Sequence, residues 1–391
     1  MSEKLNEKLG KLIEFLKANN EYYSEIFKEY GEDLRNIPFL TSQLIRLHGL
    51  AGTKKMISKN LKIGYIFSTG GTTGKPKFIC YTFDEFEIVV DLLCQCYQFV
   101  EENDIVANLF MAGNMWASFI FVNKVLQKRN CSILPISGTT NIELIKNYIE
   151  FFKPNCIVGI PTQIMQVISK DYYFLKKVLF AGELFTQNQL KFLYDMSCLV
   201  RSAGYASVDA DVIGYQCIEL KINQHHVFTE HQIVELIDLE SDESIAEEDR
   251  VGQIVVTNLD RFLNPVVRYK TGDLGKWVRT NCGCDKPTIE LLGRFDDWIR
   301  LASYDFYYQD FANVFYPLNI ALKINRNESK VTVLIEKTSE ELSIDYDEMI
   351  EKLKKENWQL REGIEEKLIK VEFEFVSSLP KTNKKIKVVY E

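Results

Sequence analysis

The segment STGGTTGKPK at residues 68–77 combines glycines, hydroxyl side chains and lysines in a way that suits phosphate binding. Glycines let the backbone take turn conformations, and such a turn can point several N–H groups at an anion. The Walker A loop, G-x-x-x-x-G-K-[ST], is the nearest general pattern. It does not match, because Thr69 stands where its first glycine belongs and Pro76 stands where the Mg²⁺-binding hydroxyl belongs. The segment predicts a phosphate cradle of another kind, with a polar surface turn that binds nothing as the alternative.

A second set of residues could bind a metal ion. Cys282 and Cys284 form a C-x-C pair, and Cys217 lies earlier, with His226 following in CIELKINQHH. Three thiolates and one imidazole are a common closed set for structural Zn²⁺. Reduced cysteines without a metal are the alternative. The other cysteines lie in apolar runs and are expected to be small buried hydrophobic residues: Cys80, Cys94, Cys96, Cys131, Cys156 and Cys198.

The elements that must position these residues follow an α/β order. IGYIFSTGG is a short apolar run entering a turn, which predicts a strand before the phosphate segment. Thr82 and Glu85 have the spacing of a capping box, so a helix is expected to start there. Further on, the apolar runs DIVANLFMAG, SILPIS, CIVGIP and KKVLFAGE alternate with amphipathic segments, which predicts a largely parallel sheet. From about residue 215 strands dominate.

The end of the chain predicts a small α+β unit. SKVTVLIEK and KVEFEFV alternate as strands do, and DYDEMIEKLKKENWQL has helical spacing. A domain boundary is expected near residue 295. The first twenty residues place Leu5, Leu9, Leu12, Ile13 and Leu16 on one helical stripe and lack the continuous apolar core of a signal peptide.

Length and composition set limits on the function. The chain has 391 residues, 46% hydrophobic and 26% charged, which is ordinary for a globular protein and long enough for two domains. Its formal net charge of −8 argues against nucleic acid or an anionic membrane as partner. No run approaches the ~20 apolar residues that span a bilayer. A cytoplasmic protein is expected.

Five segments, in order along the chain, resemble the signature motifs of the adenylate-forming superfamily of acyl-CoA ligases. They are TGGTTGKPK (69–77), YASVD (205–209), RYKTGDLG (268–275), GRFDDWIR (293–300) and LPKTNKKIK (379–387). VGIP (158–161), AGELFT (181–186) and the CGC before GRFDDWIR resemble the phenylacetate–CoA ligase branch. The resemblance implies the mixed α/β adenylate-forming fold. A large ATP- and acid-binding domain would span residues 1–295, and a small mobile α+β lid domain would span residues 296–391.

The resemblance also implies a reaction. ATP would activate a carboxylic acid to acyl-AMP with release of pyrophosphate, and the acyl group would then pass to a thiol such as CoA. The residues expected to hold the phosphates are Thr69, Gly70, Gly71, Thr72, Thr73, Gly74 and Lys77. Asp209 stands where the family has a glutamate that helps to hold Mg²⁺, and the shorter side chain leaves Asp211 as a second candidate.

Other residues match the family's nucleotide and catalytic positions. Tyr205 would flank the adenine, Asp273 would accept hydrogen bonds from both ribose hydroxyls, and Arg294 would reach the ribose or a phosphate. Lys385 matches the lysine that stabilises charge on the α-phosphate and carboxylate, although Lys384 replaces the preceding glycine and competes for this role. The rotation that delivers this lysine would occur at Asp296.

The resemblance places an acyl pocket around Trp116, Phe185, Ile160 and Ile213, with Met111, Asn114, Met115 and Phe119 nearby. These mostly bulky apolar side chains favour an aryl or compact hydrophobic acid, although ordinary core positions would look the same. In the metal set the resemblance favours His226 over His225, with Zn²⁺ in a structural role.

Three interpretations remain open at this point. The first is an AMP-forming acid–CoA ligase. The second is an adenylating enzyme that loads a carrier protein or another protein, because Ser303 and YDFYYQDF depart from the family after the hinge. The third is a catalytically silent nucleotide-binding scaffold, which Lys384, Asp209 and Ala206 slightly favour. The oligomeric state is open, with a homodimer as the commonest expectation.

Overall fold

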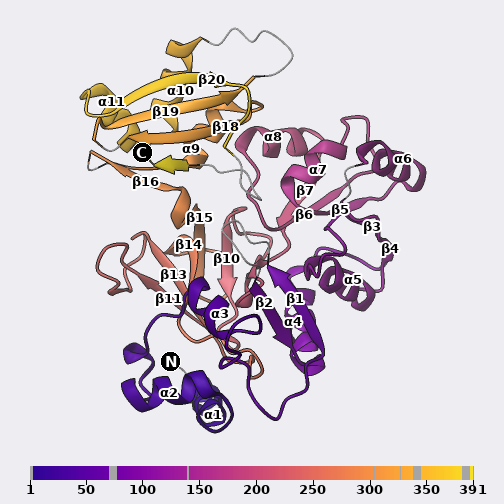
Figure 1. Ribbon diagram of the computed structural model, residues 1–391. Coiled ribbons are helices and arrows are strands. Elements are labelled where there is room, and N and C mark those ends of the chain that lie inside the picture. The colour runs from indigo at the N-terminus through magenta and orange to yellow at the C-terminus, as the bar shows by residue number, and fades with distance from the viewer. Residues whose placement is uncertain are drawn as a thin grey trace. The chain divides into compact units, whose positions relative to one another are not determined.

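The computed structural model describes residues 3–69, 77–138, 141–302, 304–325, 327–337, 345–380 and 388–390. The chain divides into two compact units, the first built mainly from residues 1–292 and the second mainly from residues 293–391 (Figure 1). The assignment of nucleotide and acid binding to one part and of a lid to the other stays a prediction. Within the described residues, no helix is both long and apolar enough to cross a membrane.

The first unit begins with helices that turn an apolar stripe toward its core. In α1 (Glu3–Asn19) the predicted stripe is buried from Leu9 to Leu16, and Leu5 is half-buried. Helix α4 (Phe83–Cys96) starts with the predicted capping box, in which Thr82 and Glu85 each accept the other's backbone N–H. The other helices before residue 293 are α2 (Glu21–Tyr30), α3 (Ser42–His48), α5 (Ser118–Lys128), α6 (Ile142–Phe152), α7 (Pro161–Val167) and α8 (Gln187–Asp195), with a 3-10 turn at Leu34–Asn36.

After helix α4 the chain forms a parallel sheet in the strand order β4–β3–β5–β6–β7. Its strands are β3 (Ile105–Asn108), β4 (Ser132–Leu134), β5 (Cys156–Gly159), β6 (Lys177–Phe180) and β7 (Leu199–Ser202). Strands β3, β4, β5 and β6 lie in the four predicted apolar runs, and helices separate consecutive strands, as the α/β alternation predicted (Figure 1).

The rest of the first unit is a mainly antiparallel sheet in the order β12–β11–β13–β14–β15–β10–β9–β8. Its strands are β8 (Tyr205–Ser207), β9 (Asp211–Tyr215), β10 (Gln224–Val227), β11 (Gln232–Ile237), β12 (Ser244–Ile245), β13 (Gly252–Asn258), β14 (Tyr269–Val278) and β15 (Thr288–Arg294). The separate hairpin pairs β1 (Tyr65–Thr69) with β2 (Lys77–Tyr81). The predicted strand before the phosphate segment is therefore confirmed.

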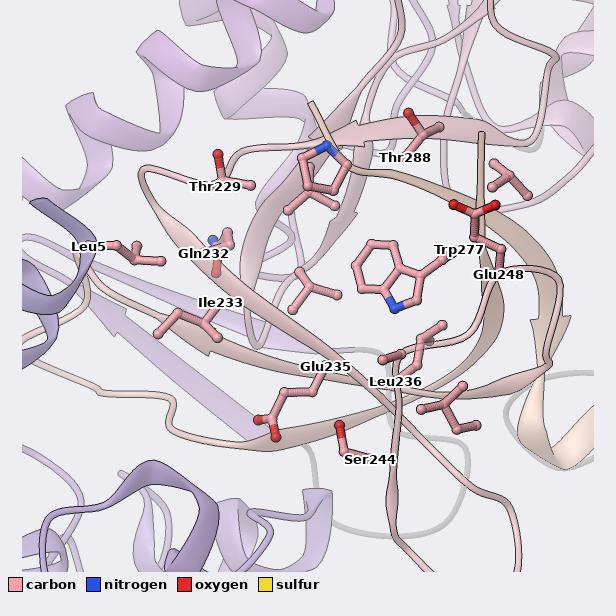
Figure 2. A pocket seen from close by; sticks show the side chains of 16 residues that line it. Leu5, Thr229, Gln232, Ile233, Glu235, Leu236, Ser244, Glu248, Trp277 and Thr288 are labelled. Atoms are coloured by element: carbon pink, nitrogen blue, oxygen red, sulfur yellow. The ribbon is translucent and has the colours of Figure 1, made fainter. Parts of the chain in front are cut away.

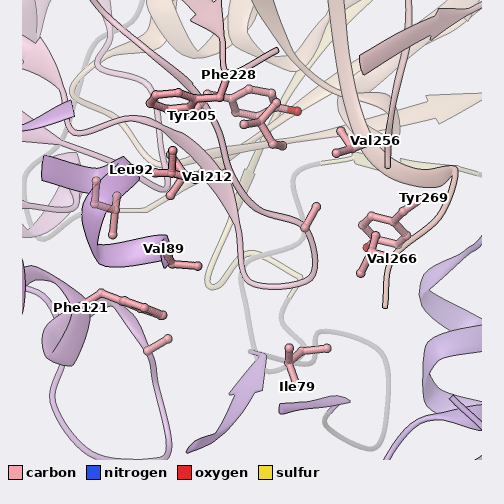
Figure 3. Close-up of a cluster of buried hydrophobic side chains, with 14 of the residues drawn as sticks. Ile79, Val89, Leu92, Phe121, Tyr205, Val212, Phe228, Val256, Val266 and Tyr269 are labelled. Carbon is pink, nitrogen blue, oxygen red and sulfur yellow. The ribbon is translucent and has the colours of Figure 1, made fainter. Parts of the chain in front are cut away.

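A large cluster of buried apolar side chains joins these elements. Figure 3 shows part of it, with Phe121 of α5 and Ile79 of β2 in the same cluster as Val256 of β13. Tyr205 and Tyr269 belong to this cluster, and both side chains are almost fully buried. Burial of a large side chain contributes roughly 1.5–3 kcal/mol, so the core holds both rings firmly and leaves their hydroxyl groups to form specific bonds.

The second unit has its own core beneath a sheet in the order β20–β19–β18–β21. Its elements are a 3-10 turn (Phe295–Asp297), β16 (Trp298–Leu301), β17 (Tyr304–Tyr307), α9 (Tyr308–Phe315), β18 (Ile320–Asn325), β19 (Lys330–Glu336), α10 (Tyr346–Glu356), α11 (Trp358–Glu365), β20 (Lys370–Val376) and β21 (Val388–Tyr390). The predicted α+β character is confirmed, because helix α10 lies between strands β19 and β20 in the sequence and the two strands pair with each other.

Candidate functional site

The segment predicted to bind phosphate lies on the β1–β2 hairpin, whose last backbone pair joins Thr69 to Lys77. Several predicted phosphate ligands lie outside the described residues: Gly70, Gly71, Thr72, Thr73, Gly74 and the side chain of Thr69. The side chain of Lys77 is described, and it leads to the rest of the site.

Lys77 is buried and forms an ion pair with Asp209, which lies between β8 and β9. The exposed fractions of the two side chains are 7% and 9%. Oδ2 of Asp209 is the oxygen that meets the Lys77 ammonium, and it also accepts a hydrogen bond from Tyr269 Oη at 2.6 Å. The Lys77 ammonium donates a further hydrogen bond to Ser42 Oγ at 2.9 Å. The fold thus joins two predicted site residues that are far apart in the chain.

The second oxygen of Asp209, Oδ1, is buried and accepts no hydrogen bond from any described residue. Such an atom costs about 1–3 kcal/mol in the folded state unless a ligand satisfies it. A carboxylate oxygen is a hard ligand of the kind that Mg²⁺ prefers. The residues therefore fit a divalent cation at Asp209.

Asp211, the second candidate for Mg²⁺, is engaged in structural bonds. Its carboxylate forms an ion pair with Arg261 at 2.7 Å and accepts hydrogen bonds from Tyr81 Oη at 2.5 Å and Asn258 Nδ2 at 2.9 Å. The Arg261 guanidinium also lies 4.1 Å from the centre of the Tyr81 ring. These bonds leave Asp209 as the better candidate, because a buried charge that already has matched partners is expensive to redirect.

The fold also brings together the residues predicted to hold the nucleoside. Tyr205 Oη donates a hydrogen bond to Asp273 Oδ2 at 2.9 Å, across 68 positions of the chain. Asp273 lies on β14, where its backbone N–H donates to Thr271 Oγ1 at 3.0 Å. Each carboxylate oxygen has two lone pairs, so the carboxylate can still accept hydrogen bonds from a diol.

The structure describes the other residues predicted to bind the nucleotide or to act in catalysis less completely. Arg294 is the last residue of β15 and is exposed. The backbone of Asp296 forms part of the 3-10 turn at Phe295–Asp297, and its side chain lies outside what the structure describes. Lys385 and Lys384 also lie outside the described residues.

The predicted acyl-pocket residues differ in their exposure. Trp116 is 37% exposed, whereas Phe185 and Ile213 are buried, Ile213 within the main core cluster. Ile160 is half-buried at the start of α7. Trp116 follows a turn in which residues 113–115 all have positive φ, and Ser68 N–H donates to Met115 O at 2.8 Å. The turn before Trp116 is therefore bonded directly to the strand that leads into the phosphate segment.

The Cys/His set predicted from the sequence is assembled in the first unit. The potential ligand atoms of Cys217, His226, Cys282 and Cys284 all lie within 4.8 Å of one another. His226 Nε2 is 3.4 Å from the sulfur of Cys217 and 3.4 Å from that of Cys282. A tetrahedral zinc site places its ligand atoms roughly 3.5–3.8 Å apart, so the cluster fits a closed Zn²⁺ site.

The neighbours of the two histidines support this choice of ligand. His226 Nδ1 forms a hydrogen bond with Thr288 Oγ1 at 2.9 Å, which leaves Nε2 toward the cysteines. His225 instead forms a bond from Nε2 to Ser202 Oγ at 2.9 Å, and burial lowers its pKa to about 3. His225 is therefore a neutral core residue.

A mostly apolar groove of about 530 Å³ lies elsewhere on the antiparallel sheet. Figure 2 shows the Trp277 ring among side chains that include Leu236 and Ile233. None of the predicted nucleotide or acyl-pocket residues lines it. Thr288, the hydrogen-bond partner of His226, lies at its edge. This groove therefore borders the Cys/His cluster and is separate from the Lys77–Asp209 pair.

Two residues of the site were missed in the sequence analysis. Tyr269 belongs to the RYKTGDLG motif, so its position could have drawn attention. Ser42 begins helix α3, and nothing in its local sequence distinguishes it from an ordinary residue at a helix start.

Comparisons with known proteins find similarity to phenylacetate-coenzyme A ligases. No family model matches the chain. The phenylacetate-coenzyme A ligase of Thermus thermophilus is 21% identical over 326 residues, which cover 77% of this chain and 72% of that protein. The phenylacetate-coenzyme A ligase of Aromatoleum evansii is 24% identical over 256 residues, which cover 61% of this chain and 56% of that protein.

Solved structures share the fold. The crystal structure of 2-hydroxyisobutyryl-CoA ligase in the postadenylation state, in complex with 2-HIB-AMP, has a TM-score of 0.78 at 14% identity and covers 99% of this chain and 89% of its own. ATP-bound MatB from Rhodopseudomonas palustris has a TM-score of 0.59 at 14% identity, over 84% of this chain and 66% of its own.

Proposed function

We propose that the chain is an AMP-forming acid–CoA ligase of the adenylate-forming superfamily, because it is similar to phenylacetate-coenzyme A ligases and shares the fold of 2-hydroxyisobutyryl-CoA ligase. In the first step a carboxylate oxygen attacks the α-phosphorus of ATP, the bond to pyrophosphate breaks, and acyl-AMP forms. In the second step the thiolate of CoA attacks the acyl carbon, and AMP leaves with the bonding electrons. The thiol proton passes to solvent.

One observation supports this proposal most strongly. Lys77 contacts Asp209, and Tyr205 contacts Asp273, although the two members of each pair are far apart in the sequence. The first pair provides charge where a triphosphate would need it, and the second provides a carboxylate for a ribose. Such positioned charges are the main catalytic requirement when a carboxylate displaces pyrophosphate.

In this proposal the chain's own residues divide the work. Lys77 neutralises phosphate charge, Asp273 orients the ribose, and Asp209 offers Oδ1 to Mg²⁺, which supplies charge neutralisation on the phosphates when bound. Lys385 is the proposed residue that stabilises the charge on the α-phosphate, with Lys384 as its competitor. Arg294 and the 69–74 segment complete the proposed nucleotide site.

The proposed substrate is an aryl or compact hydrophobic acid. The residues assigned to its pocket, Trp116, Phe185, Ile160 and Ile213, are apolar, and such a pocket binds a hydrophobic body better than a charged one. A carrier-protein thiol in place of CoA is the second proposal, because the segment YDFYYQDF, which forms β17 and the start of α9, departs from the family's pattern after the hinge. A cytoplasmic location and a homodimer remain expectations of the sequence.

We also propose that the Cys/His cluster holds a structural Zn²⁺. The ligands Cys217, His226, Cys282 and Cys284 come from the ends of β9 and β10 and from the connection between β14 and β15. Thiolates and an imidazole in all four positions leave no site for substrate, so the metal would brace the sheet rather than take part in the reaction.

The proposal is tested by carboxylate-dependent exchange of labelled pyrophosphate into ATP. A panel of aryl, short aliphatic and amino acids is offered to the wild type, to Lys385→Ala and to Lys384→Ala. We expect exchange with one class of acid, a loss of at least about a hundredfold in Lys385→Ala, and a small effect in Lys384→Ala. ATP binding without exchange for any acid would favour the catalytically silent scaffold instead.

A further inference from the structure

We propose that Tyr269 and Ser42 are positioning residues that hold Asp209 with one carboxylate oxygen turned toward a divalent cation. The inference rests on the proposed function, because it concerns how that site receives its cation. Neither residue was predicted to belong to the site, and neither is expected to touch the substrates.

The bonds around Asp209 are strongly asymmetric. Oδ2 receives both the Lys77 ammonium and the Tyr269 hydroxyl, while Oδ1 receives nothing from the described residues and is nevertheless buried. Two donors on one oxygen fix the rotation of the carboxylate, because turning it would break both bonds. An aspartate is one methylene shorter than a glutamate, so its reach toward a cation depends on being held in one orientation.

Ser42 fixes these two donors in turn. Its hydroxyl oxygen lies 2.9 Å from Lys77 Nζ and 3.1 Å from Tyr269 Oη. Ser42 thus bridges the ammonium and the phenol that meet at Asp209. Without it, the flexible Lys77 chain could move toward Oδ1 and occupy the position that the cation needs.

The chain before Ser42 is itself anchored beside β14. Leu40 donates its backbone N–H to Arg268 O at 2.9 Å and accepts one from Lys270 at 2.9 Å, so it pairs like an added strand with Tyr269. Arg268 also donates to the backbone oxygens of Arg35 and Ile37 and pairs with Glu235. These bonds set the position of the residues that precede α3, and they bring Ser42 to the site.

The test separates positioning from folding. ATP binding to the wild type, Tyr269→Phe and Ser42→Ala is measured by calorimetry in EDTA and over a Mg²⁺ titration. The phenylalanine keeps the buried ring and removes one bond to a charged group, so the Mg²⁺ concentration for half-maximal binding should rise about tenfold. Ser42→Ala should show a smaller rise, and Ser42→Thr, which keeps the hydroxyl, should restore wild-type behaviour.

Tyr172→Phe is the matched control, because Tyr172 is also buried and its hydroxyl donates to a carboxylate, Glu150, at 3.3 Å. We expect wild-type Mg²⁺ dependence in this control, and unchanged Mg²⁺-free ATP affinity in Tyr269→Phe and Tyr172→Phe. The inference is overturned if Tyr269→Phe keeps the wild-type Mg²⁺ dependence, or if it loses Mg²⁺-free binding and melting temperature together. A wild type that binds no ATP would instead refute the proposed function, and with it this inference.

Discussion

At the scale of single residues, the site depends on buried polar groups whose partners come from distant parts of the chain. Asp209, Asp211 and Asp273 lie in or beside the same sheet, but their partners differ. Asp211 is matched by Arg261 and Asp273 accepts a hydrogen bond from Tyr205, whereas Oδ1 of Asp209 accepts none from the described residues. The partners of each carboxylate, more than its position in a motif, distinguish a structural aspartate from a ligand.

Asp273→Asn should weaken ATP binding with little effect on the chemical step. An amide offers one oxygen in place of two and carries no charge, so we expect the KM for ATP to rise roughly tenfold to a hundredfold while kcat changes little. Steady-state kinetics at saturating acid measures both constants. Asp249→Asn removes an exposed carboxylate that pairs with Lys276 at 2.9 Å, and it serves as the control. An unchanged KM in Asp273→Asn would remove Asp273 from the nucleotide site.

At the scale of elements, strand ends bring the site residues together. Lys77 begins β2, Asp209 precedes β9, and Tyr269 begins β14. The Cys/His cluster likewise lies where β9 ends, on β10, and between β14 and β15. The positions of both clusters therefore depend on the pairing of the antiparallel sheet.

Loss of one cysteine ligand should therefore lower the thermal stability of the whole sheet. The purified wild type should contain about one Zn²⁺ per chain by elemental analysis, and Cys282→Ser should lose most of it and melt several degrees lower. Cys94→Ser changes a half-buried cysteine outside the cluster and should keep both metal and stability. Wild-type protein that holds no zinc after growth in zinc-replete medium would contradict the assignment.

At the scale of the whole molecule, the two compact units have separate buried clusters. Separate cores predict two thermal transitions in calorimetry. A substitution at Asp310 can identify which transition belongs to the second unit. Burial raises the pKa of Asp310 to about 6, while its Oδ2 accepts bonds from Tyr307 N–H and Asn357 Nδ2.

The sign of the pH effect follows from that raised pKa. The folded state binds the Asp310 proton more tightly than the unfolded state, so this group's stabilising contribution is complete below about pH 4 and is lost as the pH rises through about 6. Asp310→Asn keeps an oxygen for both bonds and carries no charge. It should raise the transition of the second unit by a few degrees at pH 7.5 and leave it unchanged at pH 4.

Cys282→Ser, in the first unit, provides the complementary measurement in the same calorimetric scans. It should lower the other transition and leave the one marked by Asp310→Asn in place. A single transition that both variants shift would show that the two units unfold together.

The sequence by itself determined much of the secondary structure and fold class, because many of the patterns that predict them are local. The capping box at Thr82 and Glu85, the apolar runs of the parallel sheet and the α+β pattern of the last hundred residues each depend on neighbours a few positions away. The ordered motifs also predicted the adenylate-forming fold, which the solved structures share.

Only the tertiary structure decided which polar groups meet. The bridge from Ser42 to Tyr269 spans 227 positions, the Tyr269–Asp209 bond spans 60, and the structural use of Asp211 depends on Arg261, which is 50 positions away. No periodicity records such pairs, because they form when strands and loops that are distant in sequence pack on one core. The orientation of Asp209 is set by these long-range bonds, and the residues around a motif do not reveal it.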